Sequence, residues 1–202
     1  MTNYNQAIQL NLKYAKAYFS RGNAYYELGD KQKAIADFNQ AIQLDPKYAT
    51  AYYNRGAAYS DLGDKQKAIA DYTQAIQLNP KYAKAYYNRG NAYSDLGDKQ
   101  KAIADYTQAI QLNPKYAKAY YNRGNAYSDL GDKQKAIADF NQAIQLNPKN
   151  AGAYYNRGVA YSDLGDKQKA IRDFQKAAEL FKQQGNQVWY QNALNRIKEL
   201  QP

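Results

Sequence analysis

The six residues AYYNRG at Ala51–Gly56 return unchanged at three later places in the chain, Ala85–Gly90, Ala119–Gly124 and Ala153–Gly158. The four copies begin at residues 51, 85, 119 and 153, so successive copies are spaced by 34 residues. A fixed period of this length is typical of an array of supersecondary units, each of which packs on its neighbours. The repeat therefore decides how every local feature of the chain is interpreted.

Each repeating block reads as two helices joined by a tight turn. In the second block, Gly63 suits the left-handed position that follows a helix, and Asp64 suits the N-cap of the next helix. Pro80 ends that second helix, because proline has no backbone N–H to donate and its ring clashes with the preceding turn of a helix. The sequence thus predicts an all-α solenoid of antiparallel helix pairs, in which each pair buries apolar surface mainly against its neighbours.

This period divides the chain into a half repeat, full repeats and a capping helix. The predicted segments are 1–14 for a truncated half repeat with only a second helix, 15–48, 49–82, 83–116, 117–150 and 151–184 for the full repeats, and 185–202 for the C-terminal capping helix. Trp189 in the capping helix is expected to be a core plug. Because no first helix precedes the half repeat, Ala7, Ile8 and Leu10 are expected to be uncovered, which favours end-to-end self-association.

The composition excludes several classes of protein. Cysteine and histidine are absent, which excludes disulfides, thiolate or imidazole metal sites, and the commonest nucleophiles and bases. No run approaches the ~18 apolar residues of a membrane span, and no glycine-rich phosphate loop is present. We therefore expect a cytoplasmic protein that is not an enzyme and that needs no cofactor, metal or membrane.

The pattern inside each block resembles the tetratricopeptide repeat. In the second block the matching positions are Tyr52, Gly56, Tyr59, Ala68, Tyr72, Ala75 and Pro80. The resemblance covers residues 15–184. It implies a right-handed superhelix that acts as a protein–protein interaction scaffold, with the first helix of each pair lining a concave groove for an extended peptide or a helix.

One departure from the family recurs in every block. The family usually has leucine before the glycine, whereas this chain has arginine at positions Arg21, Arg55, Arg89, Arg123 and Arg157. We expect the aliphatic stem of each arginine to pack between helices while its guanidinium reaches an acidic neighbour. The sequence alone does not identify that acid.

The helical period separates the two sides of each first helix. At about 100° per residue, Tyr86, Arg89, Gly90 and Tyr93 share the buried arc, whereas Tyr87 falls on the opposite arc. The residues predicted to bind a peptide on that opposite arc are Asn54, Asn88, Asn122, Asn156, Tyr53, Tyr87, Tyr121, Tyr155, Lys84, Lys118, Asn91 and Asn125. The asparagines would pair with the backbone of the peptide, the tyrosines would form walls, and the lysines would favour acidic segments.

Several alternatives remain open. Asn23, Asn54 and Lys84 match the family's clamp for acidic chaperone tails, but Phe19 and Asn88 stand where that clamp has basic residues. The tyrosines and asparagines could instead be structural, packing one first helix on the next in a structural or self-associating module. A net charge of +10 together with 23 tyrosines would also suit RNA or another single strand. Nucleic acid is less favoured, because the lysines gather at turns and aspartates stand near the outer face.

Overall fold

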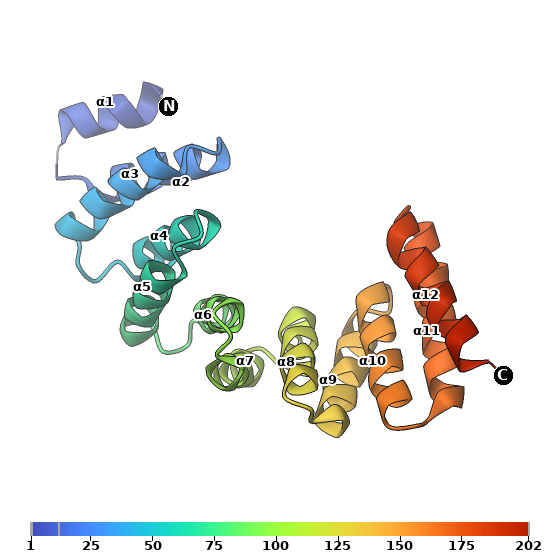
Figure 1. The fold of residues 1–202 in the computed structure, drawn as a ribbon. Helices are drawn as coiled ribbons and strands as arrows, with labels where there is room; N and C mark the ends of the chain where they lie inside the picture. Colours follow the sequence, from blue (N-terminus) through green and yellow to red (C-terminus); the bar gives the residue numbers. More distant parts are fainter. Residues whose placement is uncertain (1, 12, 202) are drawn as a thin grey trace. The chain divides into compact units, whose positions relative to one another are not determined.

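The computed structural model describes residues 2–11 and 13–201, with the backbone alone for residues 2 and 3. Throughout this described part the elements are helices and turns, so the predicted all-α solenoid of helix pairs is confirmed. The helices are α1 (Thr2–Leu10), α2 (Ala15–Glu27), α3 (Lys31–Leu44), α4 (Ala49–Asp61), α5 (Lys65–Leu78), α6 (Ala83–Asp95), α7 (Lys99–Leu112), α8 (Ala117–Asp129), α9 (Lys133–Leu146), α10 (Ala151–Asp163), α11 (Lys167–Gln183) and α12 (Gln187–Leu200) (Figure 1). Leu12, in the predicted half repeat, lies outside the described residues.

The chain forms two compact units, Met1–Lys101 and Ala102–Pro202, and each is described by itself. In the N-terminal unit, α2 pairs with α3 and α4 pairs with α5, while α3 packs on α4 and α5 packs on α6. In the C-terminal unit, α8 pairs with α9, α10 pairs with α11, and α12 packs on α11. Each unit is therefore a stack in which helix pairs cover one another's apolar sides.

The turns within the helix pairs have the chemistry that the sequence predicts. Gly63 has a φ of +86°, in the left-handed region that glycine adopts without strain. Asp64 Oδ1 accepts a hydrogen bond from the backbone N–H of Lys67 at 3.1 Å, and Lys67 Nζ lies 2.7 Å from Asp64 Oδ2. The same N-cap is formed by Asp30, Asp98, Asp132 and Asp166. The lysine in the first turn is thus paired with the acid that caps it.

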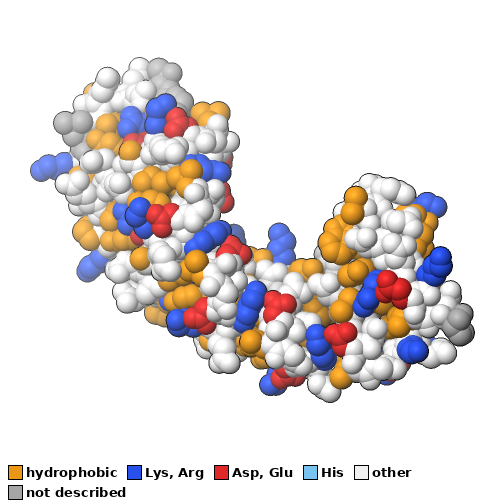
Figure 2. All heavy atoms as spheres, in the orientation of Figure 1, with side chains coloured by type: hydrophobic (Ala, Val, Ile, Leu, Met, Phe, Trp, Pro, Cys, Tyr) orange, Lys and Arg blue, Asp and Glu red, His pale blue; other side chains and the backbone are white. Residues whose placement is uncertain are grey.

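Other lysines at these turns link one repeat to the next. In the N-terminal unit Lys31 Nζ lies 3.1 Å from Asp61 Oδ2, and Lys65 Nζ lies 2.8 Å from Asp95 Oδ2. In the C-terminal unit the equivalent distance from Lys133 to Asp163 is 2.8 Å. Figure 2 shows the basic and acidic side chains interspersed over the visible face. Much of the positive charge near the turns is therefore locally neutralised.

Acid is expected to destabilise the fold through the five cap aspartates. Hydrogen bonds from the lysine three residues later hold the pKa of each of these carboxyls below its usual range. A carboxyl with a lowered folded-state pKa stabilises the fold above its unfolded pKa of about 4, and this stabilisation is lost as the pH falls through the folded value. We expect the melting temperature to fall below about pH 4, and to fall less in a variant with asparagine at all five caps, because asparagine caps without titrating. Circular dichroism melting curves against pH test this, and an equally steep fall in the asparagine variant would contradict it.

The crossing within four of the helix pairs, α2–α3, α4–α5, α8–α9 and α10–α11, is filled by an aromatic ring placed over a glycine. Phe140 on α9 is fully buried, and a Cβ added to Gly124 on α8 would lie 2.8 Å from its Cε1 atom. The glycine thus allows the two helices to approach until the ring covers the backbone. Gly56 and Tyr72 form the same arrangement in the N-terminal unit, where the corresponding distance is 3.0 Å.

Gly124→Ala is expected to destabilise the C-terminal unit by about 1–3 kcal/mol, because the buried ring has to shift. Gly152→Ala is the matched control on the next first helix. The nearest atom to its added Cβ is the hydroxyl of Tyr121 at 3.0 Å, at the far end of a side chain that can move. The control should be neutral or slightly stabilised, because alanine has the higher helix propensity. Urea denaturation of both variants measures the difference, and equal effects would argue against the ring-over-glycine crossing.

In four of the helix pairs, α2–α3, α4–α5, α8–α9 and α10–α11, the arginine before the glycine binds an aspartate that lies 16 residues later, on the second helix. Arg123 donates from Nε to Asp139 Oδ2 and from Nη2 to Asp139 Oδ1, both at 2.8 Å. Its Nη1 donates to Thr107 Oγ1 at 2.9 Å. The equivalent pairs are Arg21–Asp37, Arg55–Asp71 and Arg157–Asp173. This aspartate is the acidic neighbour that the sequence left unidentified, and the guanidinium of Arg123 joins α8 to both α9 and α7.

The predicted buried arc of α6 is only partly correct. Of Tyr86, Arg89, Gly90 and Tyr93, only Gly90 is fully buried. Arg89 Cζ lies 5.7 Å from the ring centre of Tyr86 and 6.0 Å from that of Tyr93. The two tyrosines are half-buried and flank this guanidinium.

Both ends of the chain differ from expectation in one side chain. Trp189 is 44% exposed, so the prediction that it is a core plug is wrong. Its ring lies edge-on against Tyr155 at 5.2 Å and stacked on Phe181 at 6.0 Å, at the rim of the C-terminal unit. At the other end Ile8 is buried whereas Leu10 is 88% exposed, so the uncovered surface is smaller than predicted.

Candidate functional site

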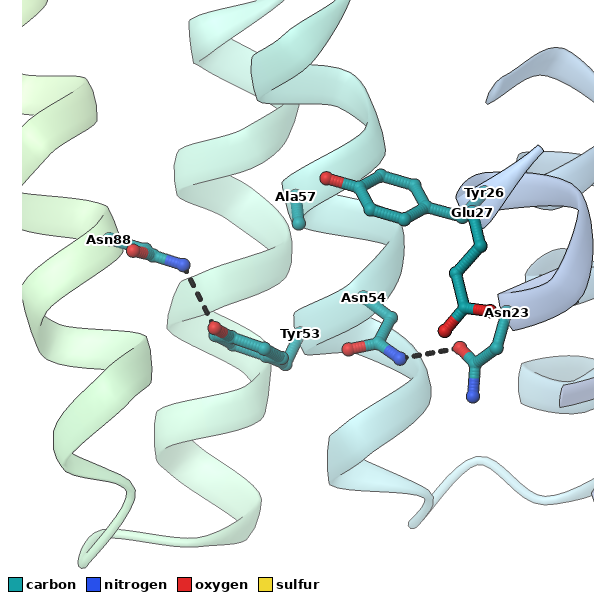
Figure 3. A pocket seen from close by; sticks show the side chains of 7 residues that line it. All are labelled: Asn23, Tyr26, Glu27, Tyr53, Asn54, Ala57 and Asn88. Atoms are coloured by element: carbon teal, nitrogen blue, oxygen red, sulfur yellow. Dashed lines mark hydrogen bonds between the residues drawn. The ribbon is translucent and has the colours of Figure 1, made fainter. Parts of the chain in front are cut away.

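A hollow of about 390 Å³ opens between three first helices of the N-terminal unit (Figure 3). Its lining consists of Asn23, Tyr26 and Glu27 from α2, Tyr53, Asn54 and Ala57 from α4, and Asn88 from α6. A second hollow of about 210 Å³ shares three of these residues and adds Ser60, Asp61, Tyr72 and Asn91. The helical period places Asn88 and Asn91 on the arc predicted to form the groove.

The asparagines of the N-terminal unit are hydrogen-bonded across successive first helices. Asn54 Nδ2 donates to Asn23 Oδ1 at 2.7 Å, and Asn88 Nδ2 donates to the Tyr53 hydroxyl at 3.0 Å. These partners lie 31 and 35 residues earlier, respectively. One asparagine can therefore reach an asparagine, a tyrosine or both on the preceding first helix.

Sequence differences between the repeats explain which bonds form. Asn54 lacks the tyrosine partner because the residue 35 positions earlier is Phe19, which has no hydroxyl. Asn88 lacks the asparagine partner because the residue 31 positions earlier is Ala57. The pattern of bonds thus follows from single substitutions at two positions of the repeat.

The C-terminal unit shows the complete arrangement. Asn156 Nδ2 donates to the Tyr121 hydroxyl at 3.2 Å and to Asn125 Oδ1 at 2.8 Å. Asn122 also takes part in an interaction. Each unit therefore contains asparagines that tie one first helix to the one before it.

Tyr53, the second tyrosine of its AYYNRG copy, packs between helices as well as facing outward. The ring centre of Tyr53 lies 4.8 Å from that of Tyr82 and 5.8 Å from that of Tyr72. Burial raises the pKa of Tyr53, whose hydroxyl accepts the bond from Asn88. Tyr53 is thus a fixed, half-buried wall with a polar edge.

An acidic side chain lies at the far end of the same arc. The Tyr26 hydroxyl donates to Asp61 Oδ2 at 2.6 Å, and Lys31 also pairs with this carboxylate. Burial and then the hydrogen bond to Asp61 raise the pKa of Tyr26 to about 12. Tyr26 therefore stays protonated at neutral pH and is held in place by this contact.

The structure brings some predicted residues together and leaves others apart. Tyr53, Asn54 and Asn88 share the larger hollow, and Asn91 lines the smaller one. Tyr121, Asn125 and Asn156 are joined by hydrogen bonds, while Tyr155 lies against Trp189. Lys84 and Lys118 are exposed, and Lys84 lines neither hollow. Tyr87 and Asn122 both make contacts.

Sequence reasoning missed Tyr26 and Glu27, which line the larger hollow. The signal was available, because they occupy the same positions in α2 as Ser60 and Asp61 do in α4. The prediction of groove residues included none from the first repeat, 15–48. It therefore overlooked the repeat that differs.

The described residues contain no group of three or more acidic, cysteine or histidine side chains that could hold a metal ion. Among those same residues, no helix has both the length and the apolar character needed to cross a bilayer. Neither observation bears on what the outward-facing arc of the first helices binds.

Comparison with family models gives matches along the chain. A model described as TPR repeat matches residues 1–29 and 22–63. A model described as tetratricopeptide repeat matches residues 49–82, 83–116, 117–150 and 151–183. No curated protein sequence matches the chain.

Solved structures give further similarity. A crystal structure of MamA is 32% identical with a TM-score of 0.78, covering 81% of this chain and 96% of that chain. Another MamA structure, residues 41 to the end from Desulfovibrio magneticus RS-1, is 24% identical with a TM-score of 0.79, covering 84% of this chain and 96% of that one. YrrB, described as a TPR protein with an unusual peptide-binding site, is 24% identical with a TM-score of 0.81, covering 95% and 97% of the two chains.

Proposed function

The chain belongs to the tetratricopeptide repeat family, and from this premise we propose that it binds an extended peptide or a helix of a partner protein along the outward-facing arc of its first helices. The family membership itself supports a protein-interaction scaffold. The observation that carries the finer proposal is the hollow between α2, α4 and α6, whose walls combine tyrosine rings with asparagine amides. Such a mixture suits a peptide, which presents both apolar side chains and backbone polar groups.

The hydrogen-bonding capacity of the asparagines supports this proposal. The hydrogen bonds between first helices use Nδ2 of Asn54, Asn88 and Asn156 as the donor. An asparagine amide also carries an acceptor oxygen, which is the group that would accept a bond from a peptide N–H. The internal bonds fix the amide orientation, which lowers the entropy lost when a peptide binds.

A structural role for the same residues is the second candidate. It is favoured by the bonds that join Asn88 to Tyr53 and Asn156 to Tyr121 across successive first helices. The two roles are compatible, because a bond that orients an amide also stabilises the stack. They differ in the outcome of substitution: a purely structural asparagine affects stability and leaves affinity for a peptide unchanged.

Other features of the partner remain predictions. Lys84 and Lys118 are exposed at the starts of α6 and α8, where they would attract acidic segments of a partner. Leu10 at the end of α1 is exposed, and self-association through this end of the chain stays a prediction. Sedimentation at rising protein concentration tests it. A cytoplasmic location, the absence of catalysis and the lack of nucleic-acid binding are predictions of the same kind.

Selection of random twelve-residue peptides displayed on phage against the full chain tests the proposed function. The expected result is a set of peptides whose synthetic copies bind the isolated protein in a fluorescence anisotropy assay. Peptides bound at the first helices should compete with one another for the chain. Failure of every selected peptide to bind in solution would contradict peptide binding.

A further inference from the structure

Ala57 on α4 interrupts a row of asparagines on the first helices. The equivalent residue of the other first helices is Asn23 in α2, Asn91 in α6, Asn125 in α8 and Val159 in α10. Ala57 lines both hollows of the N-terminal unit, and the two hollows also share Tyr26 and Asn88. Both hollows therefore open at the position where α4 lacks a side-chain amide.

Two other repeats show what an amide at this position binds. In the C-terminal unit, Asn125 Oδ1 accepts a hydrogen bond from Asn156 Nδ2 at 2.8 Å, and the same nitrogen donates to the Tyr121 hydroxyl at 3.2 Å. In the N-terminal unit, Asn23 Oδ1 accepts a hydrogen bond from Asn54 Nδ2 at 2.7 Å. In both repeats the asparagine of the next first helix thus donates to an amide oxygen at this position.

Asn88 is the side chain that has no such amide oxygen to reach on Ala57. Its Nδ2 donates to the Tyr53 hydroxyl at 3.0 Å, which is the bond that the C-terminal unit also shows to tyrosine. Burial raises the pKa of Tyr72, and a hydrogen bond between its hydroxyl and Asn88 acts in the opposite direction. A hydroxyl rotates and can either donate or accept, so this contact can rearrange around a ligand. Asn88 is therefore held at the wall of a hollow that lacks the amide oxygen of the other repeats.

The lining of the hollows suits a neutral amide better than a carboxylate. Lysine and arginine are absent from the residues that line either hollow, so the lining has no cation to pair with a carboxylate ligand. Asp61 and Ser60 line the smaller hollow, and Lys31 Nζ lies 3.1 Å from Asp61 Oδ2. A carboxylate has about four acceptor sites on its two oxygens, so Asp61 can also accept a bond from the N–H of an amide. A primary amide thus finds a donor in Asn88 and acceptors in Asp61 and Ser60.

We propose that the hollow beside Ala57 takes the side-chain amide of a glutamine or asparagine of the bound peptide, in the place that an asparagine of the chain itself occupies in other repeats. In Figure 3 the short Ala57 side chain lies between those of Asn88 and Tyr26, at a hollow of about 390 Å³. The inference deepens the proposed peptide-binding function and rests on it, because it names the side chain that the N-terminal unit selects.

The test uses two small probes that differ only at the end of one side chain, N-acetyl-glutamine amide and N-acetyl-glutamate amide. Each is titrated at pH 7 into the isotope-labelled full chain, and the side-chain amide signals of Asn54, Asn88 and Asn195 are followed by NMR. We expect the glutamine probe to shift the Asn88 signal and to bind about tenfold more tightly than the glutamate probe, a difference of about 1.4 kcal/mol. Asn195 on α12 should not respond to either probe.

Ala57→Asn supplies the missing amide from the chain itself and should abolish the preference for the glutamine probe. Val159→Asn is the matched control, since it makes the equivalent change on α10, at a residue that lines neither hollow. This control should keep the full preference. Tyr26 lines the hollow with Ala57, and the next first helix has Ser60 in its place. A second variant therefore combines Tyr26→Ser with Ala57→Asn, and it should lose the preference as well.

An Asn88 signal that the glutamine probe leaves unmoved, equal binding of both probes to the natural chain, or an undiminished preference in either Ala57 variant would overturn the inference. Selected peptides that bind the chain but tolerate alanine at every glutamine and asparagine would overturn it too, while leaving peptide binding intact. If no selected peptide binds in solution, the proposed function fails and the inference fails with it.

Discussion

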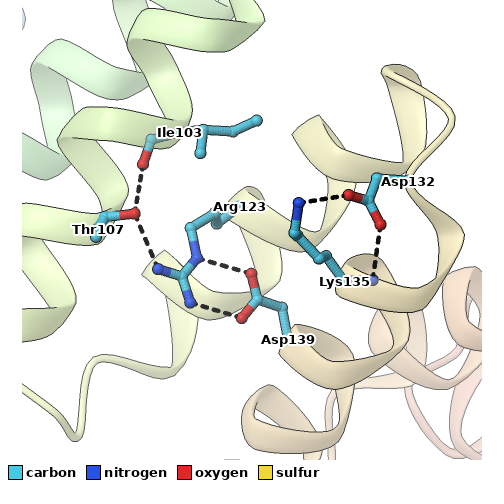
Figure 4. Close-up of polar contacts among 6 residues, drawn as sticks. All are labelled: Ile103, Thr107, Arg123, Asp132, Lys135 and Asp139. Atoms are coloured by element: carbon cyan, nitrogen blue, oxygen red, sulfur yellow. Dashed lines mark hydrogen bonds and ion pairs between the residues drawn. The ribbon is translucent and has the colours of Figure 1, made fainter.

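Asp139→Ala is expected to destabilise the C-terminal unit by about 3–5 kcal/mol, because it leaves the Arg123 guanidinium without its counter-ion. The two side chains form a bidentate pair in which Asp139 is only 7% exposed and Arg123 only 17% exposed (Figure 4). A charge that is mostly removed from water and loses two hydrogen bonds has no cheap alternative partner. Urea denaturation gives the size of the effect, and hydrogen exchange in α8 and α9 locates it.

Two further variants test whether the loss of stability comes from leaving a buried charge without its partner. Replacing both residues by apolar ones, Arg123→Leu with Asp139→Ala, should recover much of the loss, because no buried charge then remains. Glu199→Ala breaks the exposed pair with Arg196, whose Nη1–Oε2 distance is 2.9 Å, and should change stability by less than about 0.5 kcal/mol. If Asp139→Ala were as mild as Glu199→Ala, the proposed importance of the buried pairs would be wrong.

The largest expected effect on binding comes from removing all four repeated asparagines. The variant with alanine at Asn54, Asn88, Asn122 and Asn156 should bind a selected peptide about 30-fold to 10⁴-fold more weakly, if each lost bond contributes about 0.5–1.5 kcal/mol. Some stability will also be lost, because the structure shows bonds between first helices that the sequence did not predict. The higher helix propensity of alanine offsets part of that loss. Anisotropy at a temperature well below the melting point separates affinity from folding.

Asn195→Ala serves as the control for this prediction. Asn195 is an exposed asparagine on α12 that accepts a hydrogen bond from Gln191 and lines neither hollow. Its substitution should leave peptide affinity unchanged. An unchanged affinity in the fourfold variant as well, with reduced stability, would assign the asparagines to the structural role alone.

Features that depend on neighbouring residues in the chain were predictable from the sequence. Gly63 and Asp64 form the turn and cap that their residue types favour, because both roles depend on local backbone geometry. The aspartate bound by Arg21, Arg55, Arg123 or Arg157 was not predictable, because a partner 16 residues away is defined only by how the two helices are aligned. Trp189 was misjudged because its burial depends on how far α12 covers the tyrosine beside it.

The candidate site also has a part that the sequence predicted and a part that it did not. The helical period alone placed Tyr53, Asn54 and Asn88 on one arc, and they line one hollow. The hydrogen bonds from Asn54 to Asn23 and from Asn88 to Tyr53 could not be predicted, because separations of 31 and 35 residues become contacts only when successive first helices stack at a particular offset. Glu27 was overlooked because the predicted groove contained no residue of the first repeat, 15–48.

The central claim is that the outward-facing arc of the first helices binds a peptide, and NMR mapping of the binding surface tests it most directly. A selected peptide is titrated into the isotope-labelled full chain, and the side-chain amide signals of all asparagines are recorded. The account predicts that Asn54 and Asn88 shift with the same dissociation constant as the peptide, while Asn195 does not move. Shifts confined to α12 or to the second helices, with Asn54 and Asn88 unchanged at saturation, would contradict it.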